Sequence, residues 1–331
     1  MRLIQLRNRS GERRVGMVSD DSLQLLEGVD SVLALCEEAL AARERLALHA
    51  KKRVSRRSLP YDDIYSGRSD WRILPAMDHP SEPARCIVSG TGLTHVKSAQ
   101  NRQAMHKSSE APTDSMRMYE WGLEGGRPDP GQIGIAPEWF HKGWGTTLRA
   151  HGEPLIVGAH AEDGGEEPEI AAIYVIDPNG EPRRIGMAIG NEFSNHRLEK
   201  RNYLYLAASK LMPCALGPEL TLDANFERVP GEVSIERDGE TLWRREIVSG
   251  ESVMSHSLTN LEHHHFKFPG HRRPGDVHVH FLGADAFSFG EGIELRDGDL
   301  MQIRFEGFGR PLRNPLSVES LPKKVIAVMP V

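Results

Sequence analysis

Two glutamates near the middle of the chain have a spacing that could hold a metal ion. Glu167 and Glu169 flank Pro168 at the start of an apolar, β-branched run, residues 170–176. The turn sequence of residues 177–180 ends this run, so the pattern predicts a strand. Side chains two residues apart on a strand point to the same face, so both carboxylates are expected on one side. Pro168 cannot donate a ladder hydrogen bond, which places it at a strand beginning or on a sheet edge.

A third carboxylate follows the next apolar segment. Residues 185–189 predict a second strand, and Glu192 comes shortly after its end. If the two strands form a hairpin, Glu192 joins Glu167 and Glu169, and three carboxylates make an all-oxygen site suited to Mg²⁺ or Mn²⁺. The spacing alone leaves open the alternative of an ordinary acidic surface loop. Such a loop would also include Glu162, Asp163 and Glu166.

Six short motifs resemble those of the fumarylacetoacetate hydrolase superfamily and follow one another in the superfamily's order along most of the chain. They lie at residues 90–95, 137–142, 165–169 and 186–194, at Lys210 with residues 216–218, and at residues 295–316. Each motif is weak by itself, but six in order make the resemblance strong. Residues 90–106 (GTGLTHVKSAQNRQAMH) look most like the GguC-type branch, which is associated with sugar-acid catabolism.

The resemblance implies both a fold and a metal site. The superfamily has a strand-rich α+β fold in which a mixed, curled β-sheet roll carries the site. Carried over by position, Glu167, Glu169 and Glu192 would be the ligands of Mg²⁺ or Mn²⁺. Glu192 departs from the Asp that the superfamily normally has, which adds one methylene of reach. Gly165 replaces the first Asp of the superfamily's D-x-E-x-E motif.

Two further departures concern the chemistry. The superfamily's H-x-x-E dyad reads His95-Val96-Lys97-Ser98 in this chain, so the carboxylate partner of the histidine is missing from its usual place. The superfamily's T-G-T-P element is also absent at residues 281–284. In the hydrolases the dyad is linked to the activation of water. Its loss implies a protein that shares the metal-enolate chemistry of the superfamily but not its C–C hydrolysis.

The resemblance also implies which groups surround the metal. A 2-keto acid would chelate the cation through its carboxylate and keto oxygens, and an anionic substrate needs cationic groups beside three carboxylates. Lys210, with a pKa lowered by burial, could remove the C3 proton, and His95 could protonate the departing hydroxyl or act on water. The alternatives are a surface lysine and a histidine that only positions a loop. The expected substrate-binding residues are Lys142, Arg197, Phe140 and Ser194.

These expectations lead to three functional hypotheses. The first is a Mg²⁺-dependent lyase that dehydrates a 2-keto-3-deoxy sugar acid, a pentonate, through a metal-stabilised enolate to a 2-oxoglutarate semialdehyde. The second is a hydrolase that cleaves a C–C bond of a 2,4-diketo acid, with a carboxylate from residues 106–124 completing the dyad. The third is a non-catalytic sugar-acid-binding protein with the same fold.

The composition argues against several other classes. The chain has 331 residues and a formal net charge of −6, which gives no reason to expect attraction to nucleic acid or to anionic membranes. The basic residues at 51–57 lack interleaved aromatic residues, so we interpret them as a solvated helix end. No apolar run reaches the length of a membrane span, and the N-terminus lacks the apolar region of a signal peptide. A cytoplasmic protein is expected, because no disulfide or zinc pattern connects Cys36, Cys86 and Cys214.

Two domains of unequal size are expected. A small N-terminal α+β domain, a linker and a catalytic domain are placed at residues 1–74, 75–84 and 85–331. In the first domain, residues 1–6 and 14–18 predict strands, and residues 33–48 predict a helix capped by Ser31. By analogy with the superfamily, the protein is expected to form a homodimer.

Two segments outside the motifs carry structural expectations. Residues 95–130 are polar with little apolar pattern, which is typical of a lid or of an ordinary surface excursion. Residues 219–251 contain two alternating stretches around Asp238-Gly239, a hairpin turn signal, and predict an exposed β-ribbon.

A group of histidines near the C-terminal third offers an alternative metal site. Residues 258–265 predict a short helix that ends in three histidines, His263 to His265. His278 and His280 lie on one face of a predicted strand. These side chains could bind Zn²⁺ or Fe²⁺, but histidine-rich loops are commoner than histidine metal sites, and no third ligand has a diagnostic spacing.

Overall fold

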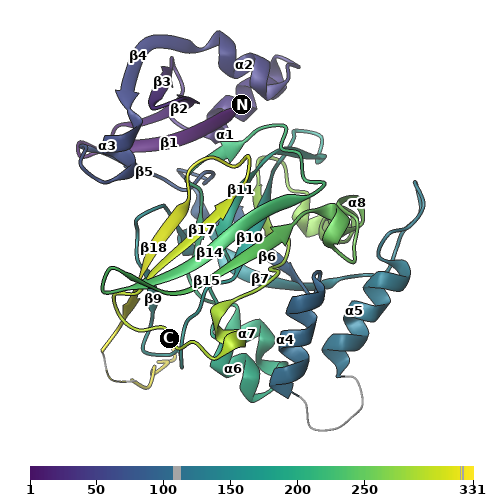
Figure 1. Ribbon diagram of the computed structural model, residues 1–331. Helices are drawn as coiled ribbons and strands as arrows, with labels where there is room; N and C mark the ends of the chain where they lie inside the picture. Colours follow the sequence, from purple (N-terminus) through teal and green to yellow (C-terminus); the bar gives the residue numbers. More distant parts are fainter. Residues whose placement is uncertain (107–112, 321, 323) are drawn as a thin grey trace.

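The computed structural model describes residues 1–106, 113–320, 322 and 324–331. Two β-sheets form its centre, and the helices lie around them (Figure 1). Within the described ranges, no helix is long and apolar enough to cross a membrane.

The larger sheet has 13 strands, ten of which form a continuous path. In spatial order these are β4 (Val54–Pro60), β3 (Ser22–Leu26), β2 (Arg13–Ser19), β1 (Arg2–Asn8), β13 (Leu220–Thr221), β11 (Pro182–Asn191), β10 (Pro168–Ile176), β16 (Val277–Phe281), β6 (Cys86–Gly92) and β7 (Glu138–Trp144). The three strands off this path are β5 (Trp71–Ile73), β8 (Leu148–Arg149) and β12 (Cys214–Leu216).

The smaller sheet has five strands and packs against the larger one. Their order is β15 (Glu240–Ser249), β14 (Val229–Arg237), β17 (Leu300–Phe305), β18 (Leu312–Val318) and β9 (Leu155–Val157). Most strand pairs are antiparallel, but β16–β6, β12–β8 and β18–β9 are parallel. The prediction of a strand-rich α+β fold with mixed sheets is therefore confirmed.

Strand β10 is buried along its whole length because both of its faces are covered. Ile170 and Tyr174 belong to a core shared with the smaller sheet. Ile173 and Val175 belong to a second core, which includes side chains from β1 and the first helix. This explains why the run after Glu169 is continuously apolar rather than alternating. Pro168 is the first residue of the strand, as the sequence predicts.

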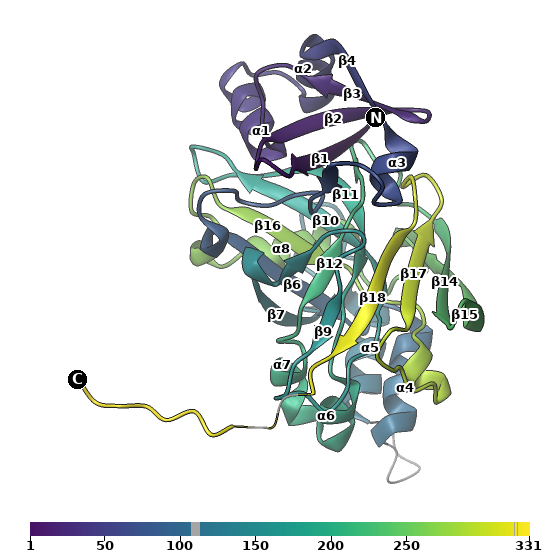
Figure 2. The ribbon, with the colours of Figure 1, turned by 90° about the vertical axis from the view of Figure 1, so that its left-hand side faces the viewer.

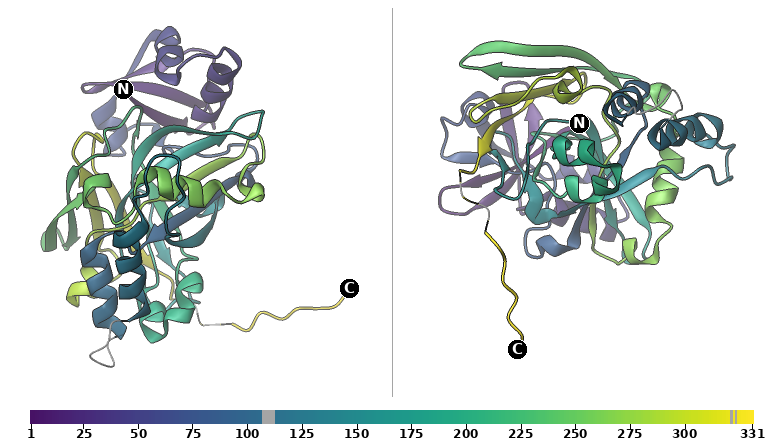
Figure 3. Two further views of the ribbon diagram at one scale, coloured as in Figure 1. Left: turned by 90° about the vertical axis from the view of Figure 1, so that its right-hand side faces the viewer. Right: turned by 90° about the horizontal axis from the view of Figure 1, so that it is seen from below.

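Most of the helices lie at two ends of the molecule, and α8 (Leu258–Phe266) lies beside the sheets between them (Figure 1). Near the N-terminus are α1 (Val32–Ala41), α2 (Leu46–Lys52) and α3 (Tyr61–Tyr65), and the others are α4 (Val96–His106), α5 (Asp114–Gly125), α6 (His196–Arg201) and α7 (Leu206–Ser209). Helices α4, α5, α6 and α7 gather at the end opposite the N-terminal elements (Figures 1 and 3). Part of the expected lid, residues 107–112, lies outside the described residues, and a lid function stays a prediction.

The N-terminal elements confirm the expected strands and correct the expected helix. Residues 33–48 form parts of two helices rather than one, because Arg43 adopts a left-handed conformation (φ 53°) between them. The side chain of Ser31 caps α1 by accepting the N–H of Ala34, as expected. The N-terminal strands continue the large sheet, because Leu3 of β1 pairs with Leu220 of β13 (Figure 2). The division into two domains stays a prediction.

The hairpin β14–β15 differs from the expected exposed ribbon. Its turn lies at Asp238-Gly239, where both residues have positive φ, as the turn signal predicts. However, β14 also pairs with β17, and one face of the hairpin is buried through Val233, Ile235 and Trp243. The exposed-ribbon prediction was wrong because β17 pairs with β14 from more than 60 residues further along the chain.

Candidate active site

The β10–β11 hairpin brings the three predicted carboxylates together. Its register pairs Glu169 with Gly190, and the N–H of Glu192 donates to the carbonyl of Glu167 at 2.9 Å. One carboxylate oxygen from each of Glu167, Glu169 and Glu192 lies within 4.8 Å of the others. All three residues are buried. The predicted convergence is therefore confirmed, and the acidic-loop alternative is excluded for these three side chains.

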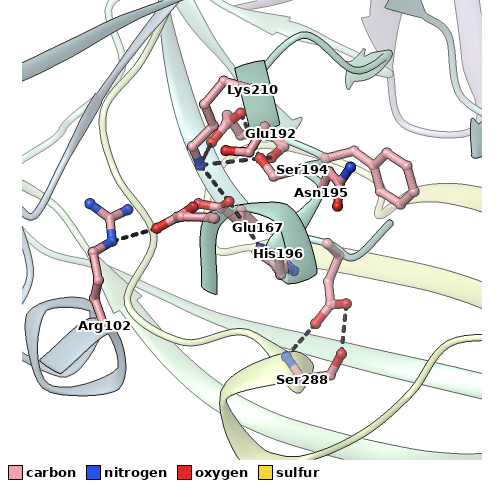
Figure 4. Close-up of polar contacts among 12 residues, drawn as sticks. Arg102, Glu167, Glu192, Ser194, Asn195, His196, Lys210 and Ser288 are labelled. Carbon is pink, nitrogen blue, oxygen red and sulfur yellow. Dashed lines mark hydrogen bonds and ion pairs between the residues drawn. The ribbon is translucent and has the colours of Figure 1, made fainter. Parts of the chain in front are cut away.

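Two buried lysines partly neutralise the cluster. Lys210 Nζ lies 2.5 Å from Glu167 Oε1 and 2.6 Å from Glu192 Oε2 (Figure 4). Lys142 Nζ lies 2.6 Å from Glu192 Oε1 and also donates to the carbonyl of Phe193. With all three carboxylates ionised, they and the two ammonium groups sum to −1. A divalent cation would change this to +1, which suits a monoanionic substrate.

The carboxylate of Glu169 has no cationic partner at hydrogen-bonding distance in the described part of the chain. Its hydrogen bond comes from the N–H of Gly283, at 2.7 Å. Burial and the neighbouring charges of Glu192 and Glu167 hold the pKa of Glu169 well above its usual range. The ionised form of this buried carboxylate therefore needs a positive charge beside it.

A divalent cation fits this donor set. One carboxylate oxygen from each residue lies within 4.8 Å of the others, so a single small cation between them could contact all three. Carboxylates are also the ligands that Mg²⁺ and Mn²⁺ prefer over soft donors. Glu167, Glu169 and Glu192 are therefore the residues that would hold the ion.

The loop after β16 reaches the carboxylates through its backbone. It occupies the position of the superfamily's T-G-T-P element, which this chain lacks. Gly283 adopts φ 101°, and a Cβ on it would lie 1.9 Å from Thr94 Oγ1. Glycine is therefore required where this loop passes between Glu169 and Thr94.

His95 is buried next to this loop as a neutral imidazole. The Thr94 hydroxyl donates to the carbonyl of Leu282 at 2.9 Å, so its oxygen accepts from His95 Nδ1 at 3.0 Å. This leaves Nε2 unprotonated, and it has no hydrogen-bond partner among the residues described. Burial lowers the pKa of His95 to about 4, although Asp285 opposes the shift. The neutral ring has an available lone pair, so it is set to accept a proton rather than to donate one.

The ionisation of Lys210 differs from the expected one. Burial lowers the pKa of this ammonium group, but Glu167 and Glu192 raise it more, so that it lies above its usual value. The lowered pKa that a basic Lys210 requires is therefore not found. Lys210 Nζ also donates to Ser194 Oγ at 3.1 Å and lies 4.8 Å from the centre of the Phe140 ring.

The remaining expected residues divide into two groups. Phe140, Ser194 and Lys142 are buried and contact Lys210 or Glu192. Arg197, in contrast, is about half exposed, and its guanidinium pairs with Glu294 at 2.7 Å. The structure does not bring Arg197 to the carboxylates.

Comparisons with known proteins support the architecture. No family model matches the chain. A probable 2-keto-3-deoxyxylonate dehydratase of Haloferax volcanii is 26% identical over 288 residues, which cover 80% of this chain and 96% of that protein. The solved structure of a 2-keto-3-deoxy-D-arabinonate dehydratase complexed with magnesium and 2,5-dioxopentanoate is 20% identical, with a TM-score of 0.70 over 96% of this chain and 99% of that one.

A third protein extends the comparison beyond dehydratases. A 5-carboxymethyl-2-hydroxymuconate delta-isomerase from Mycobacterium smegmatis is 17% identical, with a TM-score of 0.55 over 96% of this chain and 100% of that one. The chain has the fumarylacetoacetate hydrolase fold. The resemblance drawn from the six motifs is thus confirmed, and the sugar-acid dehydratase matches this chain with the higher TM-score.

Two residues beside the carboxylates were not predicted. His196 Nε2 lies 3.1 Å from Glu167 Oε1. Arg102 of α4 contacts both oxygens of Glu138 at 2.8 Å and Glu199 Oε1 at 2.7 Å, so it fastens α4 to β7 and α6. The sequence does not single out either residue, because the contacts of Arg102 and His196 depend on how α4 and α6 pack in the fold.

The histidines of α8 and β16 are paired with other groups. His265 Nε2 lies 2.9 Å from His278 Nδ1, while the ring nitrogens of His280 lie 2.8 and 2.7 Å from the hydroxyls of Ser89 and Thr91. Within the described ranges, the three glutamates are the only group of three or more residues with metal-ligand spacing. The structure therefore gives no support to the Zn²⁺ or Fe²⁺ alternative at His263–His265, His278 and His280.

These buried histidines predict a loss of stability in mild acid. Burial lowers the pKa of His278 and of His280 to about 3. The unfolded chain binds these protons near pH 6.5, so stability is present above that pH and is lost as the pH falls towards 3. Each histidine contributes up to about 1.4 kcal/mol per pH unit to this slope.

Urea unfolding between pH 7.5 and 5 measures the slope. We expect His280→Gln to have a shallower slope than the unsubstituted protein, since one titrating group is removed. The exposed His263 supplies the control, and His263→Gln is expected to keep the original slope. Equal slopes for all three proteins would contradict the assignment.

Proposed function

We propose that this protein is a Mg²⁺-dependent dehydratase that converts a 2-keto-3-deoxy sugar acid, a pentonate, to 2-oxoglutarate semialdehyde. The observation that carries the proposal is the buried cluster of three glutamates and two lysines, which suits a divalent cation with a monoanionic substrate. The Haloferax relative and the magnesium-containing dehydratase support the reaction class.

Glu167, Glu169 and Glu192 are the proposed metal ligands, with Mn²⁺ as an alternative to Mg²⁺. When bound, the cation supplies Lewis-acid polarisation of the C2 carbonyl, which makes the C3 protons more acidic. The side chains of Lys210 and Lys142 offset the negative charge of the ligands and attract the substrate carboxylate. Phe140 and Ser194 complete the wall next to Lys210.

Dehydration requires removal of a proton from C3 and departure of the C4 hydroxyl as water, which leaves a C3–C4 double bond. Tautomerisation then moves hydrogen from C5 and its hydroxyl to C3 and C4, and this forms the C5 aldehyde of the semialdehyde. Lys210 and His95 are the proposed proton-transfer residues. The sequence favours Lys210 as the base, but the hydrogen-bond pattern favours His95 Nε2 as the acceptor and the Lys210 ammonium as the donor. We therefore propose His95 as the base and Lys210 as the group that protonates the departing hydroxyl.

This assignment predicts that His95→Gln lowers kcat by about 10²–10⁴-fold, which is the usual contribution of a general base. Glutamine can still hydrogen-bond to Thr94 but cannot take up a proton. Mg²⁺ affinity measured by calorimetry is expected to stay unchanged, because His95 makes no contact with the three glutamates that the structure records. A kcat within threefold of the unsubstituted value would remove His95 from the mechanism.

The C–C hydrolase remains the second candidate because a carboxylate does approach His95. Among the described residues of the range 106–124, the expected carboxylate is not found: Asp114 pairs with Arg117, and Glu120 and Glu124 are exposed. Glu110 lies outside the described residues. Asp285 instead raises the pKa of His95 against the effect of burial, while its own carboxylate pairs with Lys97 at 3.2 Å.

Product analysis with Mg²⁺ separates these functions. Semialdehyde formed from a 2-keto-3-deoxypentonate supports the dehydratase, and pyruvate released from a 2,4-diketo acid supports the hydrolase. Binding of the sugar acid without turnover, unchanged by chelator, would indicate the non-catalytic binding protein. We also propose a cytoplasmic homodimer, by analogy with the superfamily, and analytical ultracentrifugation tests the dimer.

A further inference from the structure

His196 is held against one of the proposed metal ligands. Its Nε2 lies 3.1 Å from Glu167 Oε1, and the side chain is almost fully buried (Figure 4). A carboxylate in this cluster accepts hydrogen bonds, so Nε2 carries the hydrogen and donates it. The other ring nitrogen, Nδ1, has no hydrogen-bond partner in the part of the chain that the structure describes. Glu167 is therefore the polar contact that the ring makes.

Two aromatic rings and a helix cap hold the ring of His196 in place. Phe287 and Phe289 stack on it with centroid distances of 5.0 and 5.1 Å and interplanar angles of 17° and 30°. The side chain of the preceding Asn195 caps α6 by accepting the N–H of Leu198 at 3.1 Å. The imidazole consequently cannot turn away from Glu167 without moving the aromatic side chains or the helix.

Gly165 makes room for this ring. Its backbone pairs with Ser194 in both directions, at 3.0 and 3.1 Å, so its position is fixed. A Cβ at residue 165 would lie 2.6 Å from His196 Nδ1 and 2.9 Å from Cε1. No real Cβ tolerates such distances, so any other residue at 165 displaces the imidazole. The glycine that replaces the superfamily's Asp at position 165 therefore provides the space that the imidazole of His196 occupies.

Glu167 Oε1 accepts two hydrogen bonds, one from His196 and one from Lys210 at 2.5 Å. Among the residues that the structure describes, no hydrogen bond to the second oxygen of this carboxylate is found. The N–H of the packed imidazole reaches this oxygen from a fixed direction, and so sets the rotation of the carboxylate group and the place of the other oxygen. The Lys210 ammonium, on a flexible stem and shared with Glu192, mainly supplies positive charge.

We propose that His196 is a positioning residue that orients Glu167 for the divalent cation, in space provided by Gly165. The proposal depends on the metal site of the proposed function but not on which reaction the site catalyses. Outer partners that orient a metal ligand typically contribute 10–100-fold to metal affinity.

The hydrogen bond can be separated from the packing by two substitutions. His196→Phe keeps an aromatic ring stacked on Phe287 and Phe289 but removes the donor. His196→Gln loses the ring stacking but places an amide N–H where it can reach Glu167. Calorimetric titration with Mg²⁺ alone is expected to give a Kd raised 10–100-fold for His196→Phe and within about threefold of the original for His196→Gln. His263→Gln, at an exposed histidine, is the control.

A double-substitution cycle tests the role of Gly165. Gly165→Ala alone is expected to weaken Mg²⁺ binding at least tenfold, because the new methyl group displaces the imidazole. Once His196→Ala has removed the ring, the same Gly165→Ala change is expected to add less than a twofold effect. Thermal unfolding of each metal-free protein checks that the variants are folded, and Gly165→Ala tests the proposal if His196→Phe does not fold.

Three results would overturn the proposal. The first is an unchanged Kd for Mg²⁺ in His196→Phe, and the second is a loss of Mg²⁺ affinity as large in His196→Gln as in His196→Phe. The third is that Gly165→Ala weakens Mg²⁺ binding equally with and without the imidazole of His196. An original protein that binds no Mg²⁺ would also overturn it, together with the metal site. If Mg²⁺ binds but the 2-keto-3-deoxypentonate is not dehydrated, the proposed function fails while the role of His196 is still decided by these titrations.

Discussion

Lys210→Met is expected to lower kcat/KM by about 10³-fold or more, while Mg²⁺ binds at least as tightly as before. Methionine has a similar length and is apolar, so it suits a buried position. The substitution removes the ammonium group that contacts Glu167, Glu192 and Ser194. The charge of the cluster then changes from −1 to −2, which attracts the cation more strongly but leaves the substrate carboxylate with one fewer partner.

The two measurements together define the role of Lys210. Steady-state dehydration assays give kcat/KM, and calorimetry gives the Mg²⁺ affinity. If Lys210 served only to assemble the metal site, Mg²⁺ binding and activity would fall in parallel. The exposed Lys51 of α2 provides a matched control, since Lys51→Met removes one positive charge far from the cluster and is expected to leave both values unchanged.

The parts of the fold that could be predicted are those set by neighbouring residues. The hairpin that carries Glu167 and Glu192 follows from two apolar runs and the turn between them, and the period of a strand places Glu167 and Glu169 on one side. The break after α1 could not be predicted in this way, because Arg43 has no special preference for the left-handed conformation that it adopts. The burial of β14 depends on β17, far along the chain, and no local pattern signals it.

The same limit applies to the site. Lys142 and Lys210 were found because their motifs fix their positions, whereas Arg197 was predicted and its neighbour His196 was missed. Consecutive residues of a helix point about 100° apart, so only one of the two can face Glu167. Which one does so depends on the orientation of α6 against the hairpin, and that orientation is set by packing against Phe287 and Phe289. The sequence around α6 contains no information on this contact.

Removal of the metal is expected to abolish activity, and Glu169→Gln is expected to have the same effect with a diagnostic change in stability. Glu169 is the carboxylate without a cationic partner at contact distance among the described residues, and it lies beside Glu167 and Glu192. Glutamine has the same shape and can still accept the N–H of Gly283, but it removes one charged ligand. The Kd for Mg²⁺ is therefore expected to rise about 100-fold, and activity to fall to the level seen in excess chelator.

The stability change has opposite signs with and without Mg²⁺. In the metal-free protein, Glu169→Gln relieves the repulsion of a buried carboxylate by its two neighbours, so the Tm is expected to be higher than that of the unsubstituted protein. Saturating Mg²⁺ is expected to raise the Tm of the unsubstituted protein markedly and that of the variant little, because a ligand stabilises only the folded state that binds it. Two results would contradict a metal site at these three glutamates. One is a Tm of metal-free Glu169→Gln below that of the metal-free unsubstituted protein, and the other is an equal rise in the Tm of both proteins with Mg²⁺. This change in the sign of the Tm difference would show that the three glutamates destabilise the folded protein until a divalent cation binds to them.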